Sequence, residues 1–432
     1  MKKNNLIIDI HEKPKTHLEW FILSIQHVFA MFGATVLVPI LTGLDVGVAL
    51  VASGIGTLIY ILCTKGKVPI YLGSSFAYIG SIATAIASTG GAESAYTGLM
   101  VVGVIYVIVA AVISFTGSDW IRKLLPPVVV GPMIMIIGLS LAPTAVTETG
   151  LMGIDVLIEQ GKYAGVLGAQ WKVPLISAIT FFTVVIISMK GKGFFKIVPF
   201  LIAIVVGYVV SVFLGVVDLK EVFAGYSFIQ VPKFQFLGTY KLNFNAVAAF
   251  APLALVTIAE HIGDHIVLGE IVERDFLEEP GLHRTILGDG IATFVSAALG
   301  GPANTTYGEN TGVVAMTRVG SVYVIGFAAI LAIGLGFLGW VQAFISSIPW
   351  AVIGGMTIIL YGLIASNGVK VLIQDKTDLS DIKNLVIVAT MLVVGLGGAS
   401  VQLTSQVALS GMSLAAIFGI VLNQILNFIE KL

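Results

Sequence analysis

Two short stretches interrupt an otherwise apolar chain and decide how it must fold: PIYLGSSFAYI at residues 69–79 and PANTTYGENTG at residues 302–312. Each places a proline ahead of glycine and small polar residues. A helix satisfies its own backbone N–H and C=O groups, whereas lipid offers them no partner. Broken backbone inside a membrane is therefore stable only where protein or an aqueous cavity surrounds it, and its freed N–H groups can then donate to a ligand.

The composition of the whole chain places it in a membrane. Of its 432 residues, 57% are hydrophobic and only 11% are charged, against roughly 25% charged residues in a soluble domain. The net charge of −1 implies no general attraction to nucleic acid. The sequence therefore predicts an all-α polytopic protein of the cytoplasmic membrane, surrounded by lipid, with no nucleic-acid partner.

Fourteen stretches are candidates for membrane spans, each of which needs about 20 mostly apolar residues. They are 20–42, 45–63, 69–88, 97–116, 125–145, 173–190, 195–216, 244–267, 285–300, 304–317, 321–343, 348–366, 384–400 and 404–428. Loops on the cytoplasmic side should be rich in Lys and Arg. With the N-terminus inside, 18 of the 23 Lys and Arg residues fall on that side. We therefore expect an even number of spans, with both termini cytoplasmic.

The long loop at 217–243 divides the candidate spans into two sets of seven. With an odd number in each set, the second set enters the membrane from the opposite side, so a repeat between them would be inverted, as in many transporters. The two interrupted stretches are the third span of each set, and such a match indicates a substrate site. In the alternative interpretation, Gly73 and Gly308 only let neighbouring helices pack closely.

Three carboxylates within the predicted spans are candidates for the site. Glu260 and Asp264 are four residues apart in APLALVTIAEHIGDHIVLG (251–269), on one helical face, and Glu309 follows Gly308. An ionisable group in a span costs at least ~2.5–3.5 kcal/mol, so these are functional candidates. Carboxylates beside freed backbone donors suit a flat ligand that alternates N–H donors with C=O acceptors, such as uracil, xanthine or urate. In the alternative interpretation, Glu260 and Asp264 are simply solvated near the end of their span, and Glu309 pairs with a neighbouring helix.

Histidines supply further candidates. His261 and His265 are spaced as in the zinc motif H-E-x-x-H, but Ile262 takes the place of its glutamate, so we expect no metal site. His27 could orient a carboxylate or make an interhelical hydrogen bond, and Tyr361 could reach the site or only pack. We expect no cofactor, and the proximity of Glu260 and Asp264 suits a site that binds and releases a proton.

Residues 309–318, Glu-Asn-Thr-Gly-Val-Val-Ala-Met-Thr-Arg, resemble the signature of the nucleobase–ascorbate transporter family: an acidic or amide residue, Asn, any residue, Gly, four variable residues, Thr and a basic residue. Other stretches resemble the bacterial uracil permeases of that family: AMFGATVLVP at 30–39, YLGSSFAY at 71–78, AEHIG at 259–263, PGLHR at 280–284 and NTTYG at 304–308. The resemblance runs from about residue 17 to the C-terminus.

This resemblance implies a proton-coupled symporter, not an enzyme, with fourteen spans in two inverted seven-span repeats. It implies short β-strands in the two broken spans, at 73–78 and 306–311. It also implies a core domain at 1–116 and 244–345, and a gate domain at 117–243 and 346–432. A homodimer through the gate domain is expected on the same ground.

The resemblance also implies roles for individual residues. The substrate carboxylates fall on Glu260 and Glu309, the backbone donors on Phe76 and Gly308, and the tyrosine of the gate on Tyr361. The Phe76 ring is expected beside the base.

One position departs from the pattern, because Asp264 stands where some uracil permeases have histidine. The candidates for proton coupling are therefore Glu260, Asp264 and His27. We expect proton-coupled uptake of uracil by alternating access. Three alternatives stay open: a purine carrier of the xanthine or urate type, an anion exchanger of similar architecture, which predicts basic residues at the site, and an intramembrane metalloenzyme using His261 and His265.

Overall fold

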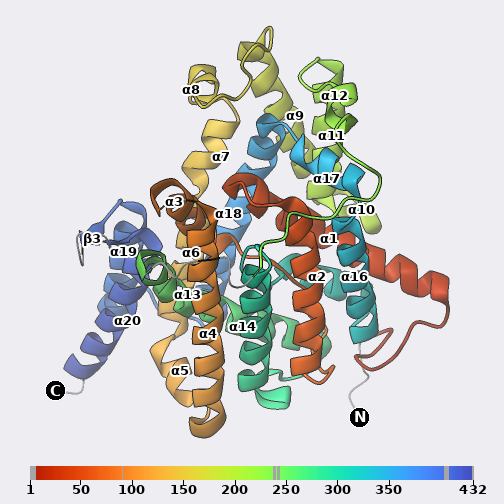
Figure 1. Ribbon diagram of the computed structural model, residues 1–432. Helices are drawn as coiled ribbons and strands as arrows, with labels where there is room; N and C mark the ends of the chain where they lie inside the picture. Colours follow the sequence, from red (N-terminus) through yellow and green to blue (C-terminus); the bar gives the residue numbers. More distant parts are fainter. Residues whose placement is uncertain (1–5, 90, 237–239, 241–243, 403–407, 431–432) are drawn as a thin grey trace.

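The computed structural model describes residues 6–89, 91–236, 240, 244–402 and 408–430, and most of them are helical (Figure 1). In this part of the chain, eight helical segments are long and apolar enough to cross a membrane. They are α1 (His17–Thr42), α2 (Val46–Cys63), α4 (Ala92–Thr116), α6 (Pro127–Ser140) with α7 (Ala142–Glu148), α9 (Ala169–Lys190), α13 (Phe244–Val272), α18 (Trp350–Gln374) and α20 (Gly411–Ile429). This agrees with the predicted all-α polytopic fold.

Shorter elements connect or complete these segments. The apolar ones are η1 (Phe76–Tyr78) with α3 (Ile79–Thr89), α11 (Pro199–Phe213), α16 (Val322–Gly336) and α19 (Ile382–Leu396). The others are α5 (Asp119–Leu124), α8 (Ile154–Glu159), α10 (Phe194–Ile197), α12 (Leu219–Phe223), η2 (Leu277–Gly281), α14 (Leu282–Ala298), α15 (Gly308–Thr317) and α17 (Gly339–Ser346). Side-chain caps mark several helix starts; for example, Asp45 accepts from the Val48 N–H at 2.9 Å, which satisfies a donor that the helix leaves free.

Several predicted spans are built from two elements rather than one helix. The stretch 125–145 divides into α6 and α7 near Leu141, 195–216 into α10 and α11, and 321–343 into α16 and α17. The predicted span 404–428 begins outside the described residues, and the predicted domain boundary at residue 243 also lies outside them.

The two interrupted stretches pair with each other as short strands. β1 (Leu72–Ser74) runs antiparallel to β2 (Asn304–Thr306), with Gly73 opposite Thr305. The strands exist as predicted, but their expected limits, 73–78 and 306–311, were wrong. Phe76 already begins a helical turn and Gly308 begins α15, because each segment turns into a helix where its strand pairing ends. A second antiparallel pair, β3 (Ser400–Gln402) with β4 (Ala408–Ser410), was not predicted.

The helices pack in two groups. The first group comprises α1, α2, α4, α13, α14, α15 and α16; the second comprises α6, α7, α9, α11, α18, α19 and α20. Small residues bring helices of the first group close together: a Cβ added to Gly103 of α4 would lie 2.7 Å from the Gly290 carbonyl oxygen of α14. The groups meet where α13 contacts α6 and α20, and where α1 contacts α11.

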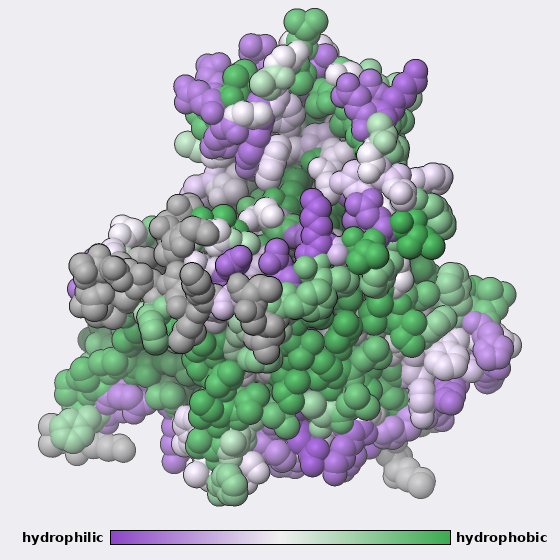
Figure 2. Space-filling view, in the orientation of Figure 1, coloured by the Kyte–Doolittle hydropathy of each residue, from purple (hydrophilic) through white to green (hydrophobic). Residues whose placement is uncertain are grey.

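The surface is arranged as a membrane protein requires. Figure 2 shows a broad hydrophobic band across the face in view, with hydrophilic residues gathered below it and at the top of the molecule. Helices α8 and α12 lie at the top, far from both chain ends, which lie at the bottom (Figure 1). Apolar side chains such as Phe115, Phe213 and Val393 are largely exposed, which lipid tolerates and water does not.

Candidate functional site

The site is built around the antiparallel pair of β1 and β2, which we call the crossing because it joins the two interrupted stretches. Buried Tyr307 locks this crossing, because its hydroxyl donates to the Ser74 carbonyl oxygen at 3.0 Å and accepts from the Thr35 hydroxyl at 3.2 Å. The ladder is extended on both sides: Ser75 N–H donates to the Ala303 carbonyl, and Tyr307 N–H donates to the Tyr71 carbonyl. The crossing is therefore rigid, and it fixes where the following helices begin.

Two helical segments start directly at this crossing. Phe76 opens η1, which continues into α3, and Gly308 opens α15, with Glu309 in its first turn. The first N–H groups of a helix have no acceptor within it, and that end carries a partial positive charge. Gly308 is exposed, and a Cβ added there would meet nothing within 4 Å. The start of α15 therefore faces open space, with donors available to a ligand.

Helix α13 brings two carboxylates to the same place. Glu260 and Asp264 are both half-buried, and the Thr306 hydroxyl of β2 donates a hydrogen bond to Asp264. Within the described residues, the Glu260 carboxylate makes no hydrogen bond. The face predicted from the four-residue spacing thus lies against the crossing, and Glu260 keeps acceptor capacity for another molecule.

The remaining predicted residues lie on three different elements, η1, α1 and α18. Phe76 is half-buried where η1 begins. His27 is buried and bonded to the residue after Glu309, since the Asn310 amide lies 3.2 Å from His27 Nδ1 and donates to the His27 carbonyl at 3.0 Å. Tyr361 of α18 is buried, and its hydroxyl has no partner among the described residues.

A small cavity of about 120 Å³ lies between the two groups of helices and reaches Glu309. Glu309 lines it from α15, and Met356 and Leu360 line it from α18, where Leu360 is the residue before Tyr361. The first and second groups therefore face each other across the side chain of Glu309.

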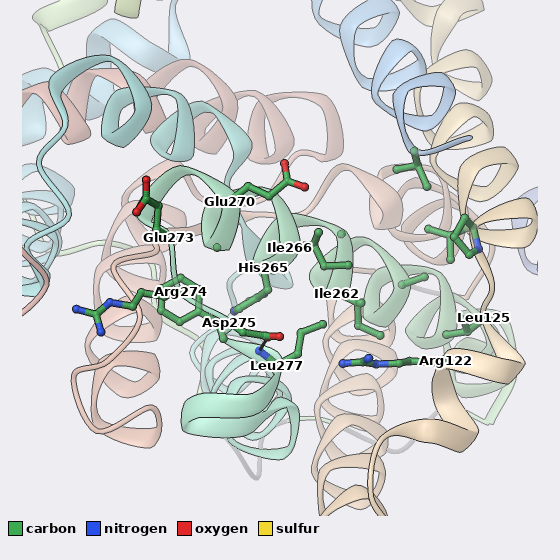
Figure 3. A pocket seen from close by; sticks show the side chains of 17 residues that line it. Arg122, Leu125, Ile262, His265, Ile266, Glu270, Glu273, Arg274, Asp275 and Leu277 are labelled. Atoms are coloured by element: carbon green, nitrogen blue, oxygen red, sulfur yellow. Dashed lines mark hydrogen bonds between the residues drawn. The ribbon is translucent and has the colours of Figure 1, made fainter. Parts of the chain in front are cut away.

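A larger cavity of about 620 Å³ lies between α13 and the α5–α6 region. Figure 3 shows Ile262 and Ile266 of α13 on one side of it, and Arg122 and Leu125 on the other. Ala259, next to Glu260, also lines the cavity. This cavity separates the two groups along α13 and leads from the neighbourhood of the carboxylates toward the charged residues at the end of α13.

The predicted histidine pair is part of a buried polar network. His261 Nδ1 lies 2.9 Å from Asp289 Oδ2, His265 Nδ1 lies 2.6 Å from the His261 carbonyl oxygen, and His265 Nε2 shares a hydrogen bond with the Tyr60 hydroxyl. Among the described residues, no three His, Cys, Asp or Glu side chains lie close enough together to hold a metal ion. Both histidines therefore serve as connections between α13, α14 and α2.

Asp289 was missed in the sequence. It lies in GDG at 288–290, inside one of the weak candidate spans, and it is fully buried. The signal was available, because an ionisable residue within a predicted span is a functional candidate on energetic grounds alone. Its partner could not be found from the sequence, since His261 lies 28 residues away on another helix.

The comparison with known sequences gives a family match over most of the chain. Residues 18–404 match the permease family Xan_ur_permease, described as "Permease family". A protein named uracil permease from Bacillus caldolyticus is 46% identical over 98% of this chain and 95% of its own length. A uracil permease from Bacillus subtilis (strain 168) is 43% identical over 99% and 96%, and one from Escherichia coli (strain K12) is 39% identical over 98% and 95%.

Solved structures share the fold at low sequence identity. The transmembrane domain of a cyanobacterium bicarbonate transporter, BicA, has a TM-score of 0.62 and 16% identity, covering 96% of this chain and 98% of that chain. Murine Slc26a9, an anion transporter in the inward-facing state, has a TM-score of 0.71 and 8% identity, covering 97% and 70%. The predicted all-α polytopic membrane fold and the predicted family are both confirmed. The family match excludes the metalloenzyme alternative. The chain belongs to the Xan_ur_permease family of multi-pass membrane permeases, which are transporters and not enzymes.

Proposed function

We propose that this protein takes up uracil across the cytoplasmic membrane, coupled to protons, by alternating access. Relatives named uracil permease that match nearly the full length support this cargo. The structural observation that carries the proposal is the crossing of β1 and β2. Two helical segments begin there, and Glu260 and Glu309 lie half-buried beside it.

Uracil has the complementary chemistry. Its ring N–H groups would donate to the carboxylates of Glu260 and Glu309, and its carbonyl oxygens would accept from the N–H groups of Phe76 and Gly308. The Phe76 ring would lie against the flat base, as aromatic rings do with planar partners. Tyr361, on α18, would approach from the second group. Acidic residues at this site disfavour an anion as cargo, although the fold is shared with anion transporters.

The proton would be bound near Glu260. Asp264 already accepts from the Thr306 hydroxyl, whereas Glu260 has no protein partner within the described residues. Protonation at Glu260, shared with Asp264, would reduce the buried charge that movement through the membrane has to carry. His27 stays a third candidate, and its bond to Asn310 connects it to the turn that holds Glu309.

We also propose the finer architecture. Fourteen spans would form two inverted repeats, and the antiparallel pairing of β1 with β2 is what two oppositely inserted segments produce. The first and second groups would be the core and gate domains, with limits 1–116, 117–243, 244–345 and 346–432. Both termini would be cytoplasmic, in accord with the Lys and Arg distribution. A homodimer through the gate stays a prediction.

Uptake by the purified protein in proteoliposomes tests the function. Radiolabelled uracil should accumulate faster under an inward proton gradient than without one. Glu260→Gln and Glu309→Gln should each weaken uracil binding about 10–100-fold, because each removes a hydrogen bond to a charged group worth about 1.5–3 kcal/mol. Glu221→Gln, on exposed α12, is the matched control and should bind normally. Equal uptake with and without the proton gradient would refute proton coupling. Normal uracil binding by both Glu260→Gln and Glu309→Gln would refute the proposed substrate site.

A purine carrier of the same family is the remaining alternative. Uracil and xanthine differ in size but present a similar edge of donors and acceptors. Unlabelled xanthine should compete poorly against labelled uracil if the proposal holds. Strong competition by xanthine and weak competition by uracil would assign the site to purines instead.

A further inference from the structure

The cavity that reaches Glu309 contains a single residue of opposite charge. Twelve residues line this cavity of about 120 Å³, and Lys196 is the one basic residue among them, as Glu309 is the one acidic residue. Most of the others are apolar, and they come from α1, α11 and α18. Within the described part of the chain, Lys196 makes no ion pair.

Lys196 is carried by a segment that is joined at both ends to helices of the second group. It lies on α10, the short helix between α9 and α11, and α10 packs against both α15 and α1. The backbone that carries Lys196 is therefore adjacent to the helix that carries Glu309. A movement of one group relative to the other would change the separation of these two side chains.

The charge of Glu309 has to be balanced differently with and without substrate. When a base is bound, its N–H group satisfies the carboxylate; when the base leaves, a half-buried carboxylate remains between apolar walls. Charges attract more strongly in such surroundings than in water. A lysine suits the role of a temporary partner, because its ammonium is a compact charge on a flexible stem.

We propose that Lys196 is the counter-charge that pairs with Glu309 in the substrate-free carrier, and that this pairing promotes the return of the empty carrier. This proposal rests on the proposed function for its transport consequences, but the pairing itself does not. Lys196 is a positioning residue here, since it acts on the substrate through Glu309.

Two transport modes separate this role from a merely structural one. Net uptake requires the empty carrier to return, whereas exchange of internal for external uracil does not. Lys196→Gln should slow net uptake about fivefold, the upper end for a pair with one exposed partner, and should change exchange less than twofold. Lys196→Arg should restore net uptake. Lys192→Gln removes the same charge from the same linker at an exposed position that does not line the cavity, and should behave as wild type.

A double-mutant cycle tests the pairing without any substrate. In substrate-free protein in detergent, Lys196→Gln should lower the melting temperature in the wild-type background but not in the Glu309→Gln background. Lys192→Gln should show no such coupling. Additive effects of Lys196→Gln and Glu309→Gln, or an equal loss of net uptake and exchange, would overturn the proposal. If the wild type carried a different base, the proposed function would fail, while the cycle would still decide the pairing.

Discussion

Gly73 lies where β1 meets β2, and the structure leaves no room there for a methyl group. An ideal Cβ on Gly73 would lie closer than 3.0 Å to the Tyr307 ring and 2.7 Å from Thr35 Oγ1. The ring cannot simply move aside, because it is buried and its hydroxyl is bonded to Ser74 and Thr35. Gly73→Ala should therefore displace Tyr307 and loosen the crossing.

The expected cost follows from two contributions. Overpacking a buried site costs about 1–3 kcal/mol, and loss of the two Tyr307 hydrogen bonds costs about 0.5–1.5 kcal/mol each. Gly73→Ala should then destabilise the protein by about 2–6 kcal/mol. In a thermal unfolding assay in detergent, the melting temperature should fall on the order of 5–10 °C. Uracil binding should weaken as well, because Phe76 and Gly308 follow directly on the paired strands.

A matched glycine provides the control. Gly80 in α3 is exposed, and a Cβ added there would meet nothing within 4 Å, so Gly80→Ala should be neutral or stabilise by up to about 1 kcal/mol. Replacing the ring should relieve the clash, so Gly73→Ala combined with Tyr307→Leu should cost less than the sum of the two single changes. A Gly73→Ala protein that melts with the wild type would refute this account of the crossing.

Three further predictions concern individual polar groups. Asp289→Leu leaves buried His261 without its hydrogen-bond partner and should cost about 1–3 kcal/mol in thermal unfolding; a stability equal to that of the wild type would show that the pair is dispensable. Tyr361→Phe removes a buried hydroxyl that has no protein partner in the described part of the chain. Because we expect this hydroxyl to face the base, the change should weaken uracil binding without lowering stability, and unchanged binding would remove Tyr361 from the site. Lys67 lies 2.5 Å from Glu279 and holds the pKa of that exposed carboxyl below its ordinary value. Lys67→Gln should therefore lower the melting temperature slightly at pH 7, and the effect should vanish as the pH falls through the lowered pKa, below which the carboxyl is protonated in the folded and the unfolded protein; an effect independent of pH would contradict this.

Local patterns were enough to find the elements of the site. Apolar runs located the membrane helices, and proline, glycine and small polar residues marked the two interrupted stretches, because these features act on the backbone of neighbouring residues. The spacing of Glu260 and Asp264 also predicted their common face. The limits of β1 and β2 were less accurate, since a strand ends where its partner leaves it, and the partner lies more than 200 residues away.

The sequence by itself determined that this chain spans a membrane, where its backbone breaks and which ionisable residues it retains among apolar ones, because each of these depends on residues close together along the chain. Only the tertiary structure decided which of those residues meet. It joined Thr306 to Asp264, His261 to Asp289, and Asn310 to His27, and it brought Lys196 into the cavity of Glu309. Such pairings depend on how separate helices pack, and the pattern along any one helix does not contain that information.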